Sequence, residues 1–397
     1  MNRTELRIFR VLILIGIVFT LMFLYKRSYC NLEYPIDSEV IGQYGDFIGG
    51  AVGTFITLLL LYVTLKLQRK TFDRQKIVSD KNIEMLAIQQ FNDKFFKLYD
   101  VYKDVLSNFY VMHNNEKLTG KSALNREYAN IYTEFNVPPV SGVRRKAATL
   151  SFINFYASHK EFAPIYFRTL FHMYEVLERA NDVKPYERHK YVKLLRSQFT
   201  ETEIVLIRYN AMTSMGENSI DYINKYNLMK HLPPMELMEY KNWRSNHELS
   251  DLQVNGINTI LLALKSKMID ALNGDDQVEI GSSDGRYKIA VNTSNCFDRM
   301  DVFIRRDLTK RLYPHDIQYE GFEGFSMNDL KDLLFYFVKD CVVLLNFNRF
   351  NIRRDLYFES MQNQQDQVEI ITVTVINNSH RRIAINYRQY EDLIKDN

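Results

Sequence analysis

Two arginine–histidine pairs have residue types and a spacing that could support catalysis. Some ribonucleases use an Arg and a His a few residues apart on one helix, and both Arg311 with His315 and Arg168 with His172 have such a spacing. Pro314 interrupts the helix that the first pair would need. The second pair falls on an expected helix, but nothing else distinguishes it from ordinary surface residues. The sequence therefore gives little support to a ribonuclease site.

The motifs of other common enzymes and metal sites are missing from the sequence. It contains no phosphate-binding loop, HExxH, GxSxG or paired CxxC motif. The three cysteines, Cys30, Cys296 and Cys341, lie far apart, which excludes a disulfide framework and a thiolate-rich zinc site. We therefore expect a protein that is not an enzyme, with no catalytic residue, metal, cofactor or small-molecule substrate. An enzyme with an undetected site near the C-terminus is an alternative.

A row of small residues indicates a different kind of chemistry, the association of helices in lipid. Gly45, Gly49 and Gly53 repeat every fourth residue and Thr57 continues the row, so on a helix they would share one face. Lipid offers no hydrophobic drive to pair helices, and close backbone approach over small residues supplies the contact. The row therefore predicts a membrane assembly face. Its partner is either an earlier span of the same chain, around Gly16, or further copies of the protein, which the length of the row favours.

Two apolar segments near the N-terminus could hold this row in a membrane. Val11–Tyr25 is uncharged and extends to a span of about residues 8–26, and Phe47–Leu65 is uncharged over 19 residues within a span of about 46–66. A signal peptide is the alternative for the first segment, but no small-residue cleavage site follows it. The positive-inside rule places both termini in the cytoplasm. Lipid headgroup contact is expected from the basic group that follows the second span: Lys66, Arg69, Lys70, Arg74 and Lys76.

The composition indicates a folded body beyond these spans. The chain has 397 residues, room for two or three domains, and only 8 Pro and 15 Gly, which argues against disorder. Its formal net charge of +3 gives no general argument for nucleic-acid binding. The 26 Phe and 26 Tyr predict a large packed interior.

Helical periodicity dominates the region after the second span. The pattern runs without Pro or Gly to His113, with Asn92 as the polar member of an apolar row, and predicts a long helix that ends within a bundle. VPPVSG (137–142) indicates a loop, and TETE (200–203) is a capping box that opens a helix. Further helices are expected at Ala147–Ser158, Pro164–Ala180, Tyr186–Ser197, Thr200–Thr213 and Asn218–Lys230.

Short alternating runs appear near the C-terminus. Val278–Ile280 and Tyr287–Val291 are expected to form a hairpin, and Val368–Ile376 to pair with Arg381–Ile385. DQVEI occurs at 276–280 and at 366–370, so either two related hairpins or coincidence explains the repeat. A long apolar helix is expected at Met327–Phe347.

The predicted fold is therefore mainly α. It comprises an N-terminal two-helix transmembrane hairpin (1–66), a long juxtamembrane helix that opens a helical cytoplasmic domain (67–235), and a C-terminal region that is helical and then a small α+β subdomain (236–397).

The order of these features resembles the AbiC-like phage abortive infection proteins of bacteria, a family that includes membrane effectors attached to some retrons. The resemblance covers about the first 235 residues and rests on four stretches: GDFIGGAVGT (45–54), FNDKFFKLYDVY (91–102), YFRTLFHMYEVLE (166–178) and YVKLLRSQFTETEIVLIRYNAMTSMG (191–216). It implies a multi-pass anti-phage effector of the bacterial inner membrane. On infection such an effector assembles in the membrane and disrupts it, and the cell dies or stops growing.

The resemblance also implies partners. Membrane lipids and further copies of the chain are expected, and a defence partner such as a reverse transcriptase with its nucleic acid is possible. The alternative function is a membrane-anchored sensor or scaffold that recruits a cytoplasmic defence partner without forming a pore.

Overall fold

The computed structural model describes residues 10, 14, 17–18, 38–47, 49–50, 53–138, 141–181, 183–274, 278–344, 356–380 and 382–383. The chain divides into two compact units, Met1–Ile83 and Glu84–Asn397. The first expected span, 8–26, lies almost wholly outside the described residues, and so do residues 48, 51 and 52 of the second. No helix within the described ranges is both long and apolar enough to cross a membrane. The transmembrane hairpin therefore stays a prediction.

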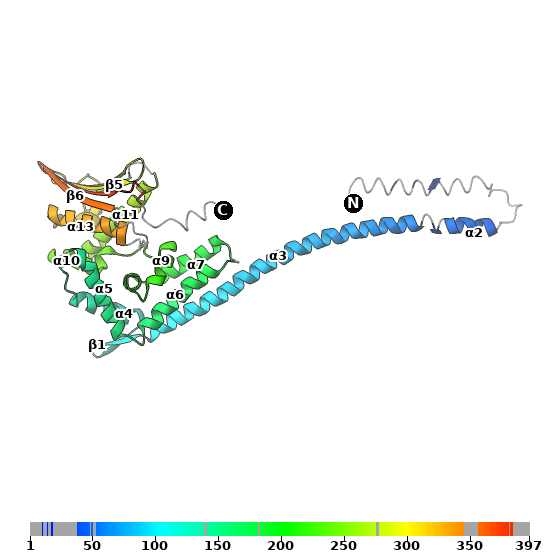
Figure 1. Cartoon of the computed structure of the whole chain (residues 1–397), viewed down its shortest axis with the longest axis horizontal. Coiled ribbons are helices and arrows are strands. Elements are labelled where there is room, and N and C mark those ends of the chain that lie inside the picture. The colour runs from blue at the N-terminus through cyan, green and yellow to red at the C-terminus, as the bar shows by residue number, and fades with distance from the viewer. Residues whose placement is uncertain are drawn as a thin grey trace. The chain divides into compact units, whose positions relative to one another are not determined.

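Two helices carry the described part of the first unit. Helix α2 spans Ser38–Phe47, and helix α3 begins at Gly53 and continues into the second unit as far as Asn108. Figure 1 shows α3 as one long helix. It contains no Pro and no Gly after its first residue, so nothing in its sequence interrupts the ladder of backbone hydrogen bonds. The prediction of a long helix here is confirmed.

The far end of α3 differs from the prediction. The helix ends at Asn108, and Tyr110–His113 is strand β1, paired antiparallel with β2 (Glu116–Thr119). Asn114 and Asn115 both have positive φ, which a tight hairpin turn requires and which Asn tolerates better than most residues. The prediction of helix to His113 was wrong because this turn signal was missed. The next helix, α4 (Gly120–Glu134), was not predicted either.

A helical body follows, and most of its predicted helices are confirmed. The Thr200 side chain and Glu203 form the expected capping box, with both of its hydrogen bonds present. Helix α9 is shorter than predicted, and helix α11 lies in the region from 236 that was expected to be helical, although its bounds were not predicted. The elements are α5 (Ser141–Ser158), α6 (Ala163–Arg179), α7 (Pro185–Gln198), α8 (Glu201–Ala211), η2 (Glu217–Ser219), α9 (Ile220–Lys225), η3 (Pro234–Glu236), η4 (Met238–Tyr240), α10 (Lys241–Asn246) and α11 (Asp251–Leu272).

A five-stranded antiparallel sheet lies toward the C-terminus, with strand order β3-β4-β5-β7-β6. Helices α11 and α13 contact the same face of this sheet (Figure 1), and alternate strand residues such as Val302 and Val373 are buried beneath them. The mainly helical fold with a sheet near the C-terminus is thus as predicted. The elements are β3 (Val278–Gly281), β4 (Tyr287–Thr293), β5 (Arg299–Asp307), η5 (Pro314–Tyr319), α12 (Glu320–Glu323), α13 (Met327–Lys339), η6 (Asp340–Leu344), β6 (Leu356–Gln365) and β7 (Val368–Asn377).

The predicted pairing of the second hairpin is wrong. Strand β7 pairs with β5 on one side and β6 on the other, and Arg382 and Ile383 are in no strand. The first hairpin, β3–β4, forms as predicted. The described part of the first DQVEI copy, 278–280, is in the first strand of a hairpin, whereas the second copy leads into the second strand of one, so the two copies do not form related hairpins. The long helix was predicted to reach Phe347. In the structure α13 ends at Lys339 and is followed by a π-helical turn, η6, to Leu344, and residues 345–355 are not described.

Candidate functional site

The residues of the predicted assembly face fall in separately described segments, because residues 48, 51 and 52 lie outside the described residues. Gly45 belongs to α2, Gly53 is the first residue of α3, and Gly49 lies between the two helices in a wider helical turn. Thr57 Oγ1 donates a hydrogen bond of 2.8 Å to the Gly53 carbonyl oxygen. A Cβ atom at Gly45 or Gly49 would meet nothing within 4 Å. Among the described residues, none therefore fills the space beside either glycine.

The predicted headgroup-binding residues lie on the adjoining part of α3. Lys66, Arg69, Lys70, Arg74 and Lys76 are all exposed. At about 100° of rotation per residue they fall within about 160° of the helix circumference, so one side of α3 carries all five. Asp73 lies within the same arc and offsets part of the charge.

Polar contacts hold the second half of α3 against α7 and α8. In each contact the two residues are 99–101 positions apart in sequence. The residue number on the α7 and α8 side rises with the residue number on α3, so α3 and α7 run side by side in the same direction (Figure 1). This constant offset fixes the register of the two helices. The pairs are Glu84 with Lys184, Asn92 with Tyr191, Tyr99 with Gln198, and Tyr102 with Glu203.

Glu203 is the most deeply buried member of this register. Its side chain is fully buried and accepts hydrogen bonds from the hydroxyls of Tyr102 on α3 and Tyr166 on α6, the latter at 2.9 Å. It also accepts from the Thr200 backbone N–H at 2.9 Å, and Lys121 Nζ lies 3.6 Å away. Burial and then the Glu203 charge raise the pKa of both tyrosines, so both hydroxyls keep the proton that they donate. We call these five residues the Glu203 cluster.

A second buried charge centre lies further along α8. Arg208 is fully buried, with Nη1 2.8 Å from Glu239 Oε1 and Nη2 3.4 Å from Asp340 Oδ1. The Tyr209 hydroxyl donates to Glu239 at 2.6 Å, and the Tyr240 hydroxyl donates to Asp340 at 3.4 Å. Burial raises the pKa of Asp340 to about 6, although the Arg208 charge opposes the shift. We call Arg208, Tyr209, Glu239, Tyr240 and Asp340 the Arg208 cluster, and its contacts join α8 to η4 and η6. A buried charge is stable only when it is paired, so Arg208 needs these acidic partners.

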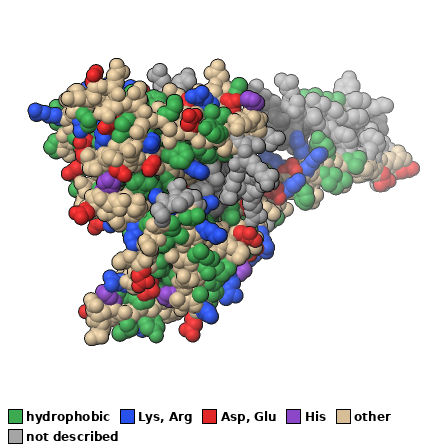
Figure 2. Space-filling model, turned by 60° about the vertical axis from the view of Figure 1, so that its left-hand side comes forward, with side chains coloured by type: hydrophobic (Ala, Val, Ile, Leu, Met, Phe, Trp, Pro, Cys, Tyr) green, Lys and Arg blue, Asp and Glu red, His purple; other side chains and the backbone are tan. Residues whose placement is uncertain are grey.

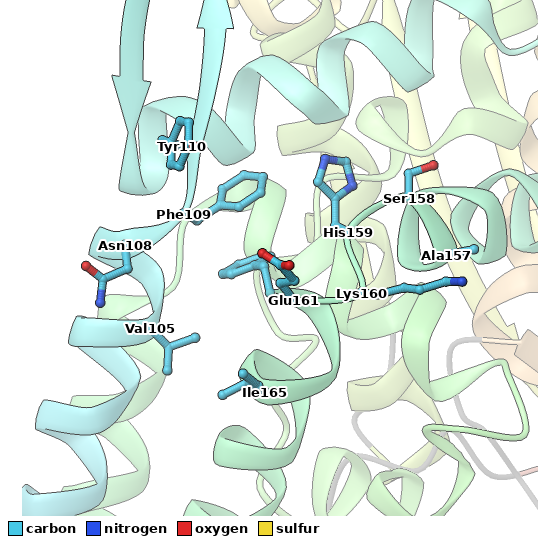
Figure 3. Close-up of a pocket in the computed structure, with 11 residues that line it drawn as sticks. Val105, Asn108, Phe109, Tyr110, Ala157, Ser158, His159, Lys160, Glu161 and Ile165 are labelled. Carbon is cyan, nitrogen blue, oxygen red and sulfur yellow. The ribbon is translucent and has the colours of Figure 1, made fainter.

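A pocket of about 780 Å³ lies where α3 ends (Figure 3). Its walls come from the end of α3 and the start of β1, and from residues 157–165 between and within α5 and α6. His159 is held by its own neighbours: Nδ1 lies 3.0 Å from the Phe155 carbonyl oxygen and Nε2 lies 3.4 Å from Glu127. The Ser158 hydroxyl donates to the Asn154 carbonyl oxygen, so His159 does not activate it as a nucleophile. Ser158 and His159 therefore do not contact each other as a nucleophile and its base.

Members of the two arginine–histidine pairs contact other residues. Arg168 Nε donates to the Pro164 carbonyl oxygen, and His172 pairs with Glu175, both on the exposed side of α6. His315 contacts the Ser283 hydroxyl at 2.8 Å from the start of η5. Among the described residues no group of three or more His, Cys, Asp or Glu side chains could hold a metal ion. Figure 2 shows acidic and basic side chains interspersed over one face of the molecule, without a large patch of one sign.

The described residues thus form a helical body that packs against a long helix through buried polar contacts, and an antiparallel sheet toward the C-terminus. Residues 158–237 match a family model described as "Putative phage abortive infection protein". The matched stretch contains α6 to α9, and both Glu203 and Arg208 lie within it. No match was found among curated proteins or among solved structures. The resemblance read from the sequence is therefore confirmed over this stretch.

Proposed function

We propose that this protein is a membrane-anchored effector of abortive infection, which on phage infection assembles in the bacterial inner membrane and disrupts it. The observation that carries the proposal is the position of the family-matching stretch. Residues 158–237 supply the surface against which α3 packs, and α3 continues without interruption into the apolar run that ends at Leu65. A change in the body would thereby reach the apolar run through a single helix.

Assembly would use the glycine row and the basic group together. No described residue lies within 4 Å of a Cβ atom at Gly45 or Gly49, so a second helix would be able to approach both closely. The exposed basic side of α3 would lie against anionic headgroups, and each such residue contributes about 1 kcal/mol. Lipids and further copies of the chain are the partners in this proposal, and a cytoplasmic defence partner would act on the body.

The test is membrane potential during infection, followed with a fluorescent dye in single bacterial cells that express the protein. We expect depolarisation before lysis in cells with the wild type and none with a Gly49→Leu, Gly53→Leu variant. Gly50→Leu is the control, because it adds a leucine beside the row at a position that, like Gly49, has nothing within 4 Å. It should leave depolarisation intact.

A membrane-anchored scaffold is the second candidate, supported by the pocket at the end of α3 and by the size of the body, Glu84–Asn397. Protection from phage with an unchanged membrane potential would favour it over the effector. Loss of depolarisation in Gly50→Leu as well would show that bulk anywhere in the segment is harmful, and would remove the support for a specific assembly face.

A further inference from the structure

One edge of the C-terminal sheet is long, regular and unpaired within the described part of the chain. Strand β6 (Leu356–Gln365) is the last strand in the order, and it pairs with β7 along its whole length without a bulge. Its other side therefore presents the N–H and C=O groups of alternate residues, which can pair with another strand.

Strand β6 itself lacks the residues and the bulge that normally prevent pairing. Exposed edge strands are usually short, or carry Lys, Pro or a bulge that blocks a second strand. β6 contains no Lys, Arg or Pro, and Glu359 is its only charged residue. The opposite edge, β3, has only four residues and is protected by its length.

The face of the sheet away from α13 adds exposed apolar side chains at this edge. Tyr357 and Met361 point to this face of β6 and are 51% and 59% exposed, and Ile370 on β7 is 38% exposed. Val375 and Val373, whose partners on β6 are Phe358 and Ser360, are fully buried on the other face. A strand added to β6 would extend this apolar face as well as the backbone ladder.

We propose that β6 pairs antiparallel with β6 of a second copy, so that the two five-stranded sheets become one continuous sheet. A two-fold axis perpendicular to the sheet makes the strands antiparallel and keeps the same face outward in both copies. In this arrangement, residues that lie opposite each other have their side chains on the same face of the sheet. The two-fold axis therefore lies between a residue and its own counterpart, and the register is named by that central residue.

Charge selects the centre among the possible registers. A register centred on Glu359 places the two Glu359 carboxylates directly opposite each other, which is destabilising. A register centred on Met361 places Met361 against its counterpart and Glu359 opposite Asn363 of the second copy. It also pairs residues 357–365 of both strands, nearly the full length of β6. A register centred on Ser360 also separates the two carboxylates, but it places Glu359 opposite the apolar Met361, so the Met361 register is the one we assign.

Crosslinking of the full-length protein in membranes tests this register. The variant Met361→Cys is made in a background with Cys30→Ser and Cys296→Ser, since Cys341 is fully buried. Residues opposite each other in such a pair have Cα atoms about 5 Å apart, within reach of a short bis-maleimide. We expect a crosslinked dimer from Met361→Cys. Tyr357→Cys is the control, because its two copies would be about 26 Å apart and should not crosslink.

A charge variant tests the same contact without a reagent. Met361→Lys places two ammonium groups opposite each other, and we expect it to reduce crosslinking of a Gln362→Cys reporter at least tenfold. Gln365→Lys, which would face Tyr357 of the second copy, should change it little. Equal crosslinking at 357 and 361, or at neither, would overturn the proposal, and so would equal loss in both lysine variants, because the assigned register places only residue 361 opposite its own counterpart.

The β6 contact does not depend on the membrane role. We expect the Met361→Cys crosslink to persist in the Gly49→Leu, Gly53→Leu background, because β6 is remote in sequence from the glycine row. Its loss there would mean that the contact follows from membrane assembly, and the proposal of an independent interface would fail.

Discussion

The Tyr191 hydroxyl on α7 donates a hydrogen bond to Asn92 Oδ1 on α3. Asn92 is the one polar member of an apolar helical row, and a polar residue in such a position specifies the register of a helix pair. Its partner is a helix of the same chain. The Tyr191 ring also lies edge-on to Phe91 and Phe95 of α3, with ring centroids 4.8 Å and 5.2 Å apart. One tyrosine thus combines a specific polar contact with aromatic packing.

Two substitutions at Tyr191 separate these contributions. Tyr191→Phe removes the hydrogen bond and keeps the ring, so we expect the free energy of unfolding to fall by about 1 kcal/mol. Tyr191→Ala removes both, and the loss should be about 3 kcal/mol or more. Urea unfolding of the detergent-solubilised protein measures both values. Equal losses would mean that the ring contributes nothing and that α3 is held elsewhere.

The Glu203 cluster should be more sensitive to a single change. Glu203→Ala leaves the Tyr102 and Tyr166 hydroxyls buried without their acceptor and removes one of the two hydrogen bonds of the α8 capping box, and we expect a loss of about 3 kcal/mol. Glu203→Gln keeps an acceptor oxygen, so its free energy of unfolding should fall by less. Tyr99→Phe, which removes only a half-buried hydrogen bond to Gln198, is the control and should cost about 1 kcal/mol or less. A Glu203→Ala protein as stable as this control would contradict the role of Glu203.

The sequence predicted the helices whose signals are local. The Thr200–Glu203 capping box and the uninterrupted α3 follow from spacing and from the lack of Gly and Pro. The end of α3 and the helix α4 were missed because the Asn114–Asn115 turn was not recognised. The pairing of β7 with β5 joins residues about seventy positions apart, and no local pattern encodes such a partner.

The buried polar centres were predictable only in part. Glu203 stood out as a capping residue, but its contacts with Tyr102 and Tyr166 bring together three helices that the sequence could not place. Arg208 had a visible signal, since it is the one basic residue within the apolar run of α8. A charge in such a run calls for a buried partner. The sequence could not show that the partners are Glu239 and Asp340, because only the tertiary fold brings them together.

The Arg208 cluster should make stability depend on pH through Asp340. Burial raises the pKa of this carboxyl from 3.8 to about 6, so the folded protein takes up a proton at a higher pH than the unfolded chain. Between about pH 4 and 6 the folded state therefore binds more protons, and the free energy of unfolding contributed by Asp340 falls as the pH rises. The measurement is the difference between wild type and Asp340→Asn in urea unfolding across this range. That difference should decrease from pH 4 to pH 6, and a flat or rising difference would contradict the assigned direction.

The basic group on α3 should set the orientation of the protein if the apolar run spans a membrane. Replacing Lys66, Arg69, Lys70, Arg74 and Lys76 by Gln removes the charges that the positive-inside rule counts. We expect the fraction of molecules with a cytoplasmic C-terminus to fall, as read by a C-terminal reporter active on one side only. Asp73→Asn with Asp80→Asn is the control, since acidic residues contribute little to orientation. An unchanged fraction in the quintuple variant would show that these residues do not orient the chain.

The contact between α11 and η5 gives a prediction whose sign is informative. A Cβ atom at Gly256 of α11 would lie 2.8 Å from the carbonyl oxygen of Gln318 in η5 and 2.9 Å from its Cα, so the backbone itself blocks a side chain. In a helix with free space around it, Gly→Ala would stabilise by about 1 kcal/mol. Here we expect Gly256→Ala to destabilise by about 1–3 kcal/mol, because η5 must move away from α11. Gly324→Ala is the matched control: its Cβ would meet nothing within 4 Å and its φ is negative, so a small gain is expected. Urea unfolding of both variants decides the question, since a gain at both positions would mean that α11 and η5 are not in close contact.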